Sequence, residues 1–484
     1  MTETLTPDIC IIGGGAGGFA VAAGAAAFGV AVVLIEKGEM GGDDLNYGSV
    51  PAQVLRNAGS AAHVMTSAQD LGLAPVQPAV DMAALQQRIR ATIAGLAPAV
   101  SEARLTAMNV RVVRAAARFV SSKAVDAGDV RIEARRFVIA TGSSPTVPKI
   151  AGLEYVRALT NETVFDLREL PQRLIIAGAS RHGLELAQAF RRLGSEVIVL
   201  DARTVLSDMD PEFVDHLLGA LTREGIEIRQ NVKIERIEPD GKGIRAIVAS
   251  GAQTDTVVGS HLLITAGRSA NVHNLGLEQA GIAFGPDGIK VRANLRTSNR
   301  RVYAIGDVAQ NNILQDGSAQ AAQYQAGLVL RSLLFRQSAA VVPGLVPQAL
   351  YTDPEIAVVG QQDDGAGKLG LKTMVYRWPF AETEKARAAL GPGGHGPANG
   401  HIKVIVAPNG QILGAGIVGP QASELIAPWQ LAIAKKLKIG DMADLIVPHP
   451  SFSEVSRRAS LMYYSVKLHS SLLQSVIGLL RKLG

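Results

Sequence analysis

The fold of this chain is decided by residues 10–18, which read Cys-Ile-Ile-Gly-Gly-Gly-Ala-Gly-Gly. Here Gly13, Gly15 and Gly18 form a Gly-x-Gly-x-x-Gly pattern directly after a short apolar strand. A helix is predicted over 19–27 and a second strand over 30–35, which makes a strand, turn, helix and strand in series. Glycines in such a turn let the backbone approach a pyrophosphate, whose charge then lies at a helix N-terminus.

An acidic residue, Glu36, closes the second strand at the place where a carboxylate can accept ribose hydroxyls. The glycine pattern and this acid together predict a dinucleotide site. Residues 9–35 carry no charge, which by length alone would suit a membrane span. Their alternation of strand, turn and helix indicates instead a βαβ unit that is buried on all sides.

A second and weaker copy of the pattern lies at Gly178, Ser180 and Gly183, followed by a predicted helix over 184–193 and a strand over 196–200. Ser180 occupies the position of the middle glycine of the pattern. Its side chain would weaken phosphate binding there, or its hydroxyl would donate a hydrogen bond to the phosphate. A relic without function is the alternative. Asp201 ends the second strand and favours NADH over NADPH, although the nearby Arg203 weakens that preference.

Composition and charge fit a large globular chain of 484 residues with 47% hydrophobic content, 51 glycines and 4% aromatic residues. These values predict two to four α/β domains. The net charge of +5 comes from basic residues scattered among acids, so nucleic-acid binding is not expected. Glu3 and Asp8 near the N-terminus argue against a secretory signal, and a cytoplasmic location is expected.

The chain contains a single cysteine, Cys10, in the first predicted strand. No intrachain disulfide can form, and a dithiol couple cannot carry electrons. Cys10 is expected to be a buried apolar residue. No metal site is expected.

Two dinucleotide units in series indicate a flavin and a nicotinamide cofactor in one enzyme. The chain resembles the pyridine nucleotide-disulfide oxidoreductase family, which includes dihydrolipoamide dehydrogenase, glutathione reductase and mercuric reductase. Besides the glycine patterns, the resemblance rests on Ala140-Thr141-Gly142, Ala266-Gly267-Arg268, Tyr303-Ala304-Ile305-Gly306-Asp307, Tyr351-Thr352-Asp353-Pro354-Glu355 and His449-Pro450-Ser451-Phe452-Ser453-Glu454.

The resemblance implies an α/β fold with two Rossmann-like dinucleotide-binding domains, for FAD and NAD, and a C-terminal α+β dimerisation domain. The expected segments are 1–150 and 268–340 for the FAD domain, 151–267 for the NAD(P) domain and 341–484 for dimerisation. A homodimer whose active site is shared across the interface is expected. The tail over 466–483 repeats apolar residues at helical spacing, and we expect it to pack on the dimer rather than on a membrane surface.

The resemblance also implies which residues hold the cofactors, with Asp307 along the flavin ribityl chain. The expected FAD-binding residues are Gly13, Gly15, Gly18, Glu36, Gly42, Asp43, Gln53, Ala117, Thr141, Gly142, Gly306 and Asp307. The expected nicotinamide-site residues are Gly178, Ser180, Gly183, Glu185, Asp201 and Gly267. NAD(H) is the expected second cofactor, with NADP(H) left open.

Residues 41–51, Gly-Gly-Asp-Asp-Leu-Asn-Tyr-Gly-Ser-Val-Pro, depart from the family at its redox-active cysteines. Asp44 stands at the cysteine that attacks substrate, and Ser49 at the cysteine beside the flavin. A serine hydroxyl stays protonated and a carboxylate has no accessible redox couple, so disulfide and mercury reduction by a dithiol relay are excluded. Asp43 and Asp44 could form an acid/base centre, or they could cap a helix that begins near Leu45.

The family's catalytic pair is retained as His449 and Glu454. In the family this histidine reaches the partner subunit's active site, and a carboxylate behind an imidazole fixes its tautomer for proton transfer. The expected catalytic residues are therefore His449, Glu454, Asp44 and Ser49. A structural hydrogen bond at a dimer interface is the alternative.

The sequence therefore predicts an FAD-dependent oxidoreductase that moves hydride or electrons between NAD(P)H and a small-molecule acceptor or substrate directly through the flavin. Quinones, dyes, oxygen or a small organic substrate are the candidates, and substrate oxidation with electron flow in the reverse sense is left open. Nicotinamide transhydrogenation is a related alternative. A catalytically silent flavin-binding scaffold or partner subunit is the alternative from another class.

Gln53 stands at the family's lysine, which places positive charge near the reactive flavin nitrogen. The Gln53→Lys variant is expected to have a higher flavin midpoint potential, because a cation favours the anionic reduced flavin. Redox titration of both holoproteins against a dye measures the shift. An unchanged potential would mean that glutamine only preserves a hydrogen bond.

Overall fold

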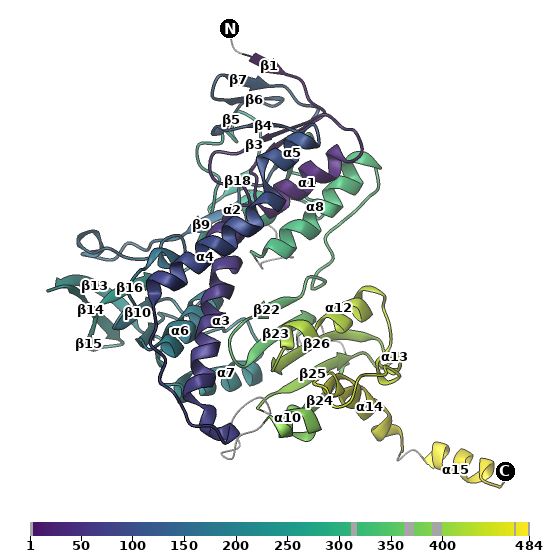
Figure 1. Ribbon diagram of the computed structural model, residues 1–484. Helices are drawn as coiled ribbons and strands as arrows, with labels where there is room; N and C mark the ends of the chain where they lie inside the picture. Colours follow the sequence, from purple (N-terminus) through teal and green to yellow (C-terminus); the bar gives the residue numbers. More distant parts are fainter. Residues whose placement is uncertain (1–2, 311–316, 363–371, 390–398, 469–470, 483–484) are drawn as a thin grey trace. The chain divides into compact units, whose positions relative to one another are not determined.

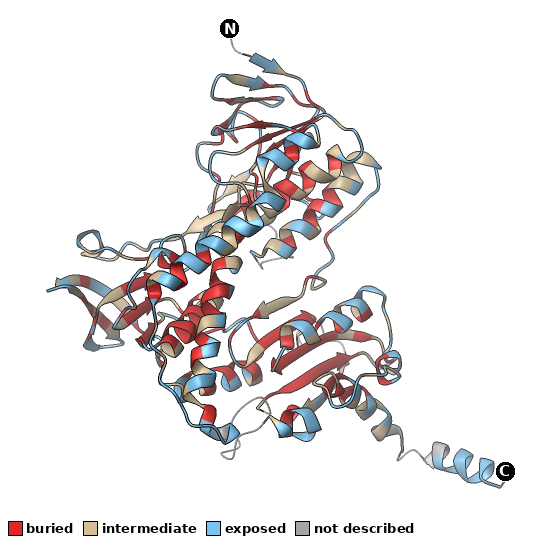
Figure 2. Ribbon diagram, viewed as in Figure 1, coloured by how far each residue is buried: buried red, intermediate tan, exposed pale blue. Residues whose placement is uncertain are grey.

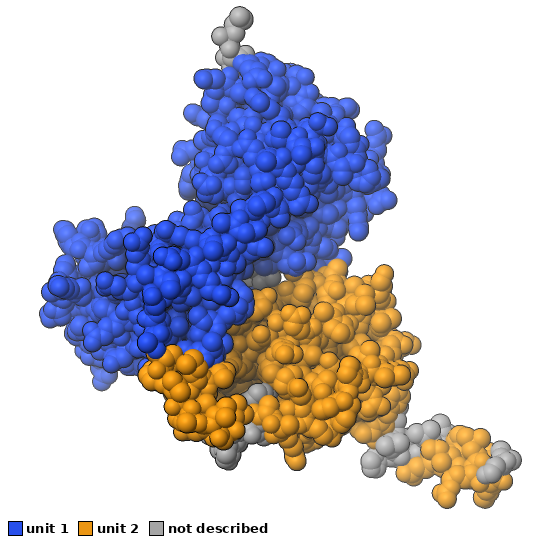
Figure 3. Space-filling view, in the orientation of Figure 1, with its two compact units in different colours: residues 1–63, 79–203, 227–343 blue, residues 64–78, 204–226, 344–484 orange. Residues whose placement is uncertain are grey.

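A computed structural model describes residues 3–310, 317–362, 372–389, 399–468 and 471–482. The chain divides into two compact units, coloured separately in Figure 3. Unit 1 comprises residues 1–63, 79–203 and 227–343, and unit 2 comprises residues 64–78, 204–226 and 344–484. The expected segment boundaries at 150, 267 and 340 stay a prediction.

Unit 1 is built on a five-stranded parallel sheet in the order β20-β8-β2-β3-β4. Its strands are β20 (Val302–Ala304), β8 (Arg136–Ile139), β2 (Ile9–Ile12), β3 (Val32–Ile35) and β4 (Arg111–Val113). Helices α1 (Ala16–Ala26) and α8 (Ala319–Leu334) lie side by side in Figure 1. The predicted βαβ unit is confirmed, but its helix begins inside the predicted turn, at Ala16.

Smaller sheets and helices surround this parallel sheet within unit 1. One four-stranded sheet has the order β1-β7-β6-β5, with β1 (Glu3–Leu5), β7 (Val130–Ile132), β6 (Ala124–Ala127) and β5 (Ala117–Ser121). A short pairing joins β9 (Ser143–Pro145) to β17 (Arg268–Ala270). In another small sheet, β19 (Gly288–Lys290) pairs with both β18 (Phe284–Gly285) and β21 (Ala309–Gln310). The helices are α2 (Gly42–Asn46), α3 (Ser49–Thr66), which ends in unit 2, α4 (Met82–Leu96) and α5 (Glu102–Ala107).

A second parallel sheet in unit 1 has the order β12-β11-β10-β16. Its strands are β12 (Glu227–Arg229), β11 (Glu196–Leu200), β10 (Arg173–Ala177) and β16 (His261–Ile264), and α6 (Arg181–Leu193) connects β10 to β11. Between β12 and β16, the chain forms an antiparallel sheet of β13 (Lys233–Asp240), β14 (Gly243–Ser250) and β15 (Gln253–Gly259). The second βαβ copy is therefore a complete structural unit.

Unit 2 contains a five-stranded antiparallel sheet in the order β22-β23-β26-β25-β24, whose central strands are buried in Figure 2. Its strands are β22 (Gln348–Leu350), β23 (Glu355–Gly360), β26 (Ile412–Gly419), β25 (His401–Val406) and β24 (Met374–Pro379). Its helices are α7 (Pro211–Arg223), α10 (Glu384–Ala388), α11 (Ala422–Leu425), α12 (Ala427–Ala434), α13 (Ile439–Ala443), α14 (Glu454–Leu468) and α15 (Ser471–Leu480). The mixed α/β fold class predicted from the sequence is confirmed.

The predicted tail helix is present as the end of α14 and as α15. On α15 the side chains of Val476, Ile477, Leu479 and Leu480 are exposed. Among the described residues, no helix is both long enough and apolar enough to cross a membrane.

The glycines of the first turn are required by close backbone contacts. Gly13 has a φ of +110°, and a Cβ there would lie 2.3 Å from the carbonyl oxygen of Ala140. A Cβ on Gly18 would lie 1.9 Å from the carbonyl oxygen of Gly13. Gly18 therefore lets α1 begin directly against the turn.

The Gly18→Ala variant is expected to lose about 3 kcal/mol of stability, because backbone atoms must move to admit the methyl group. Its flavin content after purification should fall as well. Gly327→Ala is the matched control: it lies exposed inside α8 with no atom within 4 Å of its added Cβ. Alanine there should stabilise the helix by about 1 kcal/mol. If the two variants had equal thermal stability and equal flavin absorbance, the expected steric effect of a methyl group at Gly18 would be wrong.

A largely buried network of charged side chains connects the start of α7 to β25 within unit 2. The Nζ of Lys403 lies 2.6 Å from Oδ2 of Asp210 and 2.9 Å from Oε1 of Glu212. Burial alone would lower the pKa of Lys403, but hydrogen bonds to Asp210 and Glu212 outweigh it and raise that pKa. Arg377 also donates to Glu212, and chiefly for this reason the pKa of Glu212 falls from its usual 4.5 to about 2.

Because the folded-state pKa of Glu212 is depressed, its stabilising contribution is present above pH 4.5 and is lost as the pH falls through about 2. At neutral pH we expect Glu212→Gln to cost about 1 kcal/mol, since this carboxylate is partly exposed. The stability difference from the parent protein should shrink steadily through that acid range. Denaturant unfolding at several pH values measures it, with the exposed Glu235→Gln as control. A difference independent of pH would exclude this role of Glu212.

Candidate functional site

The segment that carries Asp43 and Asp44 lies directly against the first glycine turn. The N–H of Gly41 donates to the carbonyl oxygen of Gly14 at 3.0 Å. A Cβ on Gly42 would lie 2.8 Å from the Cα of Gly15, so two backbones meet here with no room for a side chain. The two glycines at 41 and 42 are thus required by packing as well as by their φ values of +88° and +64°.

Unit 1 contains a cavity of about 500 Å³ beside this contact. Most of the residues predicted to bind FAD line it: Gly13, Gly15, Glu36, Gly42, Asp43, Ala117, Thr141, Gly142, Gly306 and Asp307. Two predicted catalytic residues, Asp44 and Ser49, line it as well. Gly18 and Gln53 are not among the lining residues: Gly18 is buried beneath the turn, and Gln53 is exposed on α3.

Glu36 is held in place at the end of β3 by two backbone donors. Its Oε2 accepts the N–H of Gly14, and its Oε1 accepts the N–H of Gly38, both at 2.6 Å. The turn and the carboxylate are therefore fixed relative to each other. A glycine cradle with a fixed carboxylate at one end fits the pyrophosphate and ribose of a dinucleotide.

The half-buried acid Asp307 belongs to a network that reaches Asp43. Its Oδ2 accepts the hydroxyl of Ser143 at 2.5 Å, and burial raises the pKa of Asp307 although Ser143 and Arg268 oppose this. The guanidinium of Arg268 donates to Ser143 and lies 3.1 Å from Oδ1 of Asp43. Asn161 donates to the same Asp43 oxygen at 3.1 Å. Ser143 follows the Ala-Thr-Gly motif, and sequence reasoning did not select it.

Asp43 and Asp44 occupy the first turn of α2, and neither side chain caps the helix, because the N-cap residue is Gly41. The capping alternative is therefore wrong, although acids in a first turn still favour the helix dipole. Asp43 is paired with Arg268, whereas the carboxylate of Asp44 has no hydrogen-bond or ionic partner among the described residues. Asp44 is half-buried and Ser49 exposed, and both face the cavity.

Tyr47 also lines this end of the cavity, and sequence reasoning missed it. Burial, followed by the charges of Glu162, Glu39, Asp166 and Asp43, raises the pKa of Tyr47. Its phenol therefore stays protonated and is a hydrogen-bond donor. The signal available in the sequence was its position between Asp44 and Ser49.

The second glycine turn repeats the geometry of the first at three points. Gly178 has a φ of +106°, and its Cβ would meet the carbonyl oxygen of Thr265 at 2.7 Å. Asp201 accepts the N–H of Ala179 at 2.7 Å, as Glu36 does in the first turn. Ser180 is the N-cap of α6, and its Oγ accepts the N–H of Gly183 at 3.1 Å. The serine thus replaces glycine without disturbing the start of the helix.

Glu185, in the first turns of α6, is buried and paired with a residue that sequence reasoning missed. Nη1 of Arg56 lies 2.5 Å from its Oε2. Arg56 also donates to Oε1 of Gln53, and the Nδ1 of His182 lies 3.8 Å from Oε2 of Glu185. Gly267 follows β16, next to the residues that meet Gly178.

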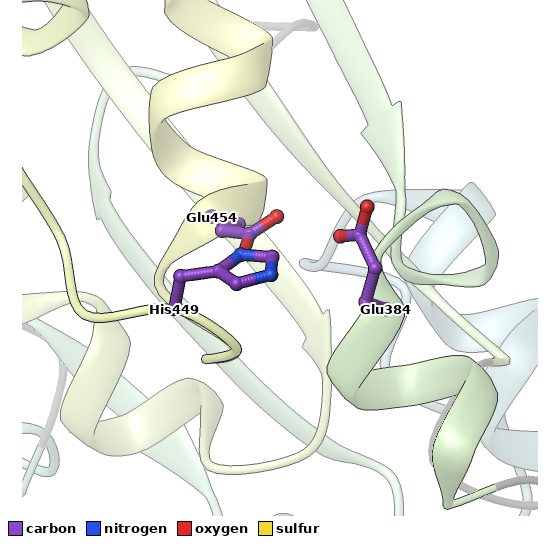
Figure 4. A group of neighbouring side chains, drawn as sticks. All are labelled: Glu384, His449 and Glu454. Atoms are coloured by element: carbon purple, nitrogen blue, oxygen red, sulfur yellow. The ribbon is translucent and has the colours of Figure 1, made fainter.

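In unit 2, His449 and Glu454 form the predicted pair. The Nδ1 of His449 lies 2.5 Å from Oε1 of Glu454, whose side chain is 9% exposed while that of His449 is 64% exposed. Nη2 of Arg458 donates to Oε2 of Glu454 at 3.1 Å and to Glu384 at 3.0 Å. Figure 4 shows the imidazole directly against the carboxylate of Glu454, with Glu384 to one side on a separate helix. The arrangement fixes one imidazole nitrogen and leaves the other accessible.

The ligand atoms of Glu384, His449 and Glu454 lie within 4.8 Å of one another, which is a spacing that could hold a metal ion. Arg458 already supplies positive charge to both carboxylates, so we assign no metal there. Cys10 is fully buried in β2, and burial raises the pKa of its thiol well above the usual value. The prediction that Cys10 is a buried apolar residue is confirmed.

Sequence comparison identifies relatives along almost the whole chain. Residues 7–326 match the pyridine nucleotide-disulphide oxidoreductase family, and residues 346–460 match its dimerisation domain. The dihydrolipoyl dehydrogenase of Thermus scotoductus is 32% identical over 482 residues, covering 96% of this chain and 99% of its own length. The mercuric reductase of Lysinibacillus sphaericus is 29% identical over 459 residues, covering 94% and 82%.

Two solved structures have the same fold at 24% identity. LpdA from Mycobacterium tuberculosis has a TM-score of 0.84 and covers 95% of this chain and 99% of its own. The flavoprotein disulfide reductase RclA from Escherichia coli, as a Cu(II) complex, has a TM-score of 0.82 and covers 96% and 100%. The dimerisation domain supports a homodimer. The chain belongs to the pyridine nucleotide-disulphide oxidoreductase family of FAD-dependent NAD(P)H oxidoreductases, and with one cysteine in all it lacks the redox-active pair.

Proposed function

We propose that this protein is an FAD-dependent oxidoreductase that passes electrons from NAD(P)H through the flavin directly to a non-disulfide acceptor. The observation that carries the proposal is the lining of one cavity. Its glycine cradle, Glu36 and Asp307 are those expected for FAD, while Asp44 and Ser49 occupy the end where the family has its thiols.

The residues present fit FAD, because the contact of Gly15 with Gly42 leaves bare backbone at the pyrophosphate position, and Glu36 is held at the ribose position. Asp307 lines the same cavity and is a half-buried acceptor for hydroxyls. Bound flavin would supply hydride acceptance from a nicotinamide and electron donation in one- or two-electron steps. Protein side chains would bind the cofactor, orient the substrates and move protons.

NAD(H) is the nicotinamide that the second turn favours. The carboxylate of Asp201 lies at the end of β11, where it accepts the N–H groups of Ala179 and Arg203 and would repel a 2′-phosphate. Arg203 lies two residues after Asp201, and its positive charge weakens this repulsion. The preference for NAD(H) over NADP(H) is therefore partial. The hydroxyl of Ser180 caps α6 as an acceptor and keeps its proton for donation to a phosphate.

Proton transfer is assigned to His449, oriented by Glu454. The short contact through Nδ1 leaves Nε2 for the substrate, and Arg458 holds the far oxygen of the carboxylate. In the proposed homodimer this pair would serve the active site of the partner subunit. Asp44 and Ser49 would contact the acceptor, and the protonated Tyr47 would donate to an acceptor oxygen. Quinones, dyes, oxygen and small organic substrates are the candidate acceptors. A cytoplasmic location stays a prediction.

The alternative function is a flavin-binding scaffold without turnover. Ser180, which stands where the family has glycine, favours this alternative. Transhydrogenation between nicotinamides is a second alternative, since it needs the flavin but no thiol. An anaerobic NADH titration of the purified holoprotein separates these functions.

We expect NADH to bleach the flavin rapidly at about one equivalent per FAD, because no dithiol is present to take a second electron pair. Stopped-flow absorbance measures the rate and the stoichiometry. Reoxidation by a quinone would identify the direct route, and reoxidation by thionicotinamide dinucleotide would identify a transhydrogenase. If neither NADH nor NADPH bleached the flavin at any concentration, the protein would be a scaffold.

A further inference from the structure

The guanidinium of Arg458 is shared between two carboxylates beside His449. Its Nη2 lies 3.1 Å from Oε2 of Glu454 and 3.0 Å from Oε2 of Glu384. The other oxygen of Glu454, Oε1, lies 2.5 Å from Nδ1 of His449. Glu454 therefore contacts the imidazole on one side and the cation on the other.

The carboxylate of Glu454 is the buried member of this group. Its side chain is 9% exposed, whereas those of Arg458, Glu384 and His449 are 31%, 55% and 64% exposed. Water screens a charge near a buried carboxylate less than it screens two exposed charges. The effect of Arg458 on Glu454 is therefore stronger than that of the exposed Glu384 on Arg458.

Contacts from three elements fix the position of the guanidinium. Arg458 lies four residues after Glu454 on α14, so the two side chains share one helix face. The guanidinium lies over the ring of Trp378 on β24, 5.8 Å from its centre. Glu384, at the start of α10, contacts it from a separate helix, to one side of the imidazole in Figure 4. Arg458 is thus held against the carboxylate that orients His449.

Electrostatic effects connect Glu384 to the same group. The pKa of Glu384 is lowered, first by a hydrogen bond from its own backbone N–H, and then by Glu454, Arg458 and His449. Two further cations belong to the same helices. Lys385 of α10 lies over the ring of Phe452, and the exposed Arg457 of α14 lines a cavity of about 620 Å³ together with His449, Glu454 and Arg458. The rest of the described lining of this cavity is uncharged.

A cation on Glu454 changes how firmly the imidazole keeps a proton. A carboxylate behind an imidazole stabilises its protonated form. Arg458 neutralises part of the charge of Glu454 and also repels a protonated imidazole, so both effects favour release of the proton. Glu384 opposes them, because it neutralises part of the charge of Arg458.

We propose that Arg458 is a positioning residue that makes His449 a readier proton donor, and that Glu384 limits this effect. The proton leaves from Nε2, which the contact with Glu454 leaves accessible, and goes to an acceptor that has taken electrons from the flavin. NAD(P)H supplies the electrons, and solvent water reprotonates the imidazole. The role in turnover rests on the proposed function.

A purely structural role of Arg458 makes a different prediction. If the guanidinium only joined α14 to α10, loss of either Arg458 or Glu384 would lower stability and leave the titration of His449 unchanged. The proposal instead predicts that these two losses shift the titration of His449 in opposite directions.

The test uses the full-length holoprotein and the variants Arg458→Met, Arg458→Lys and Glu384→Gln. Arg457→Met is the matched control, because it removes an exposed cation from the neighbouring position of the same helix. The nine histidines are labelled with ¹³C, and the signal of His449 is identified by its loss in His449→Gln. Nuclear magnetic resonance then measures the pH at which His449 is half protonated.

We expect Arg458→Met to raise this midpoint by about half a pH unit or more, and Glu384→Gln to lower it by a smaller amount. Arg458→Lys and Arg457→Met should leave it close to that of the parent protein. Flavin reduced with dithionite is also reoxidised by a quinone over a range of pH. The reoxidation rate should decline at higher pH in Arg458→Met and at lower pH in Glu384→Gln.

Shifts of the same sign in Arg458→Met and Glu384→Gln would overturn the proposal, as would equal midpoints in Arg458→Met and Arg457→Met. Where Arg458→Met does not fold, the exposed Glu384→Gln decides, because an unchanged midpoint there contradicts the proposal. The proposed function fails separately, when NADH and NADPH do not bleach the parent protein. The titration of His449 needs no turnover and is still measured in that event.

Discussion

The structure of unit 1 depends on backbone atoms meeting backbone atoms at the first glycine turn. Gly18 lies against Gly13, Gly13 against Ala140, and Gly42 against Gly15, each at a distance that admits no Cβ. These contacts bring β2, β8, α1 and α2 to one point, and the cavity opens from that point. Asp44, at the predicted position of one family cysteine, is therefore held in place by backbone packing, because Gly41 and Gly42 at the start of α2 lie against the first turn.

Charge compensation explains which acids at the cavity are available for chemistry. Asp43 is paired with Arg268, Asp307 is bonded to Ser143, and Glu36 is held by two backbone N–H groups. Asp44 differs from these three, because no described residue binds its carboxylate. A fixed and paired acid shapes a site, whereas a half-buried acid without a partner can bind a substrate or exchange a proton. Asp44 is for this reason the strongest candidate for contact with the acceptor.

Sequence reasoning identified the βαβ units, the glycine turns and the His449–Glu454 pair, because each depends on residues close together in the chain. Of the two alternatives that it left open for Asp43 and Asp44, capping is wrong, since α2 starts at Gly42 with Gly41 as its N-cap. It missed Arg56, whose partner lies 129 residues away on α6. No local pattern marks such a pair, which forms where Gly59 of α3 packs closely on Ala189 of α6.

Gln53 stands where the resemblance places the family's lysine, and its side chain is directed away from the cavity. Its amide oxygen accepts from Arg56, and its amide nitrogen donates to Asn57, one turn further along α3. Gln53 is exposed and does not line the cavity, to which α3 contributes Ser49 alone among the described residues. In the proposed direct route, an acceptor could therefore approach along the side of Ser49 without meeting a cationic side chain of this helix.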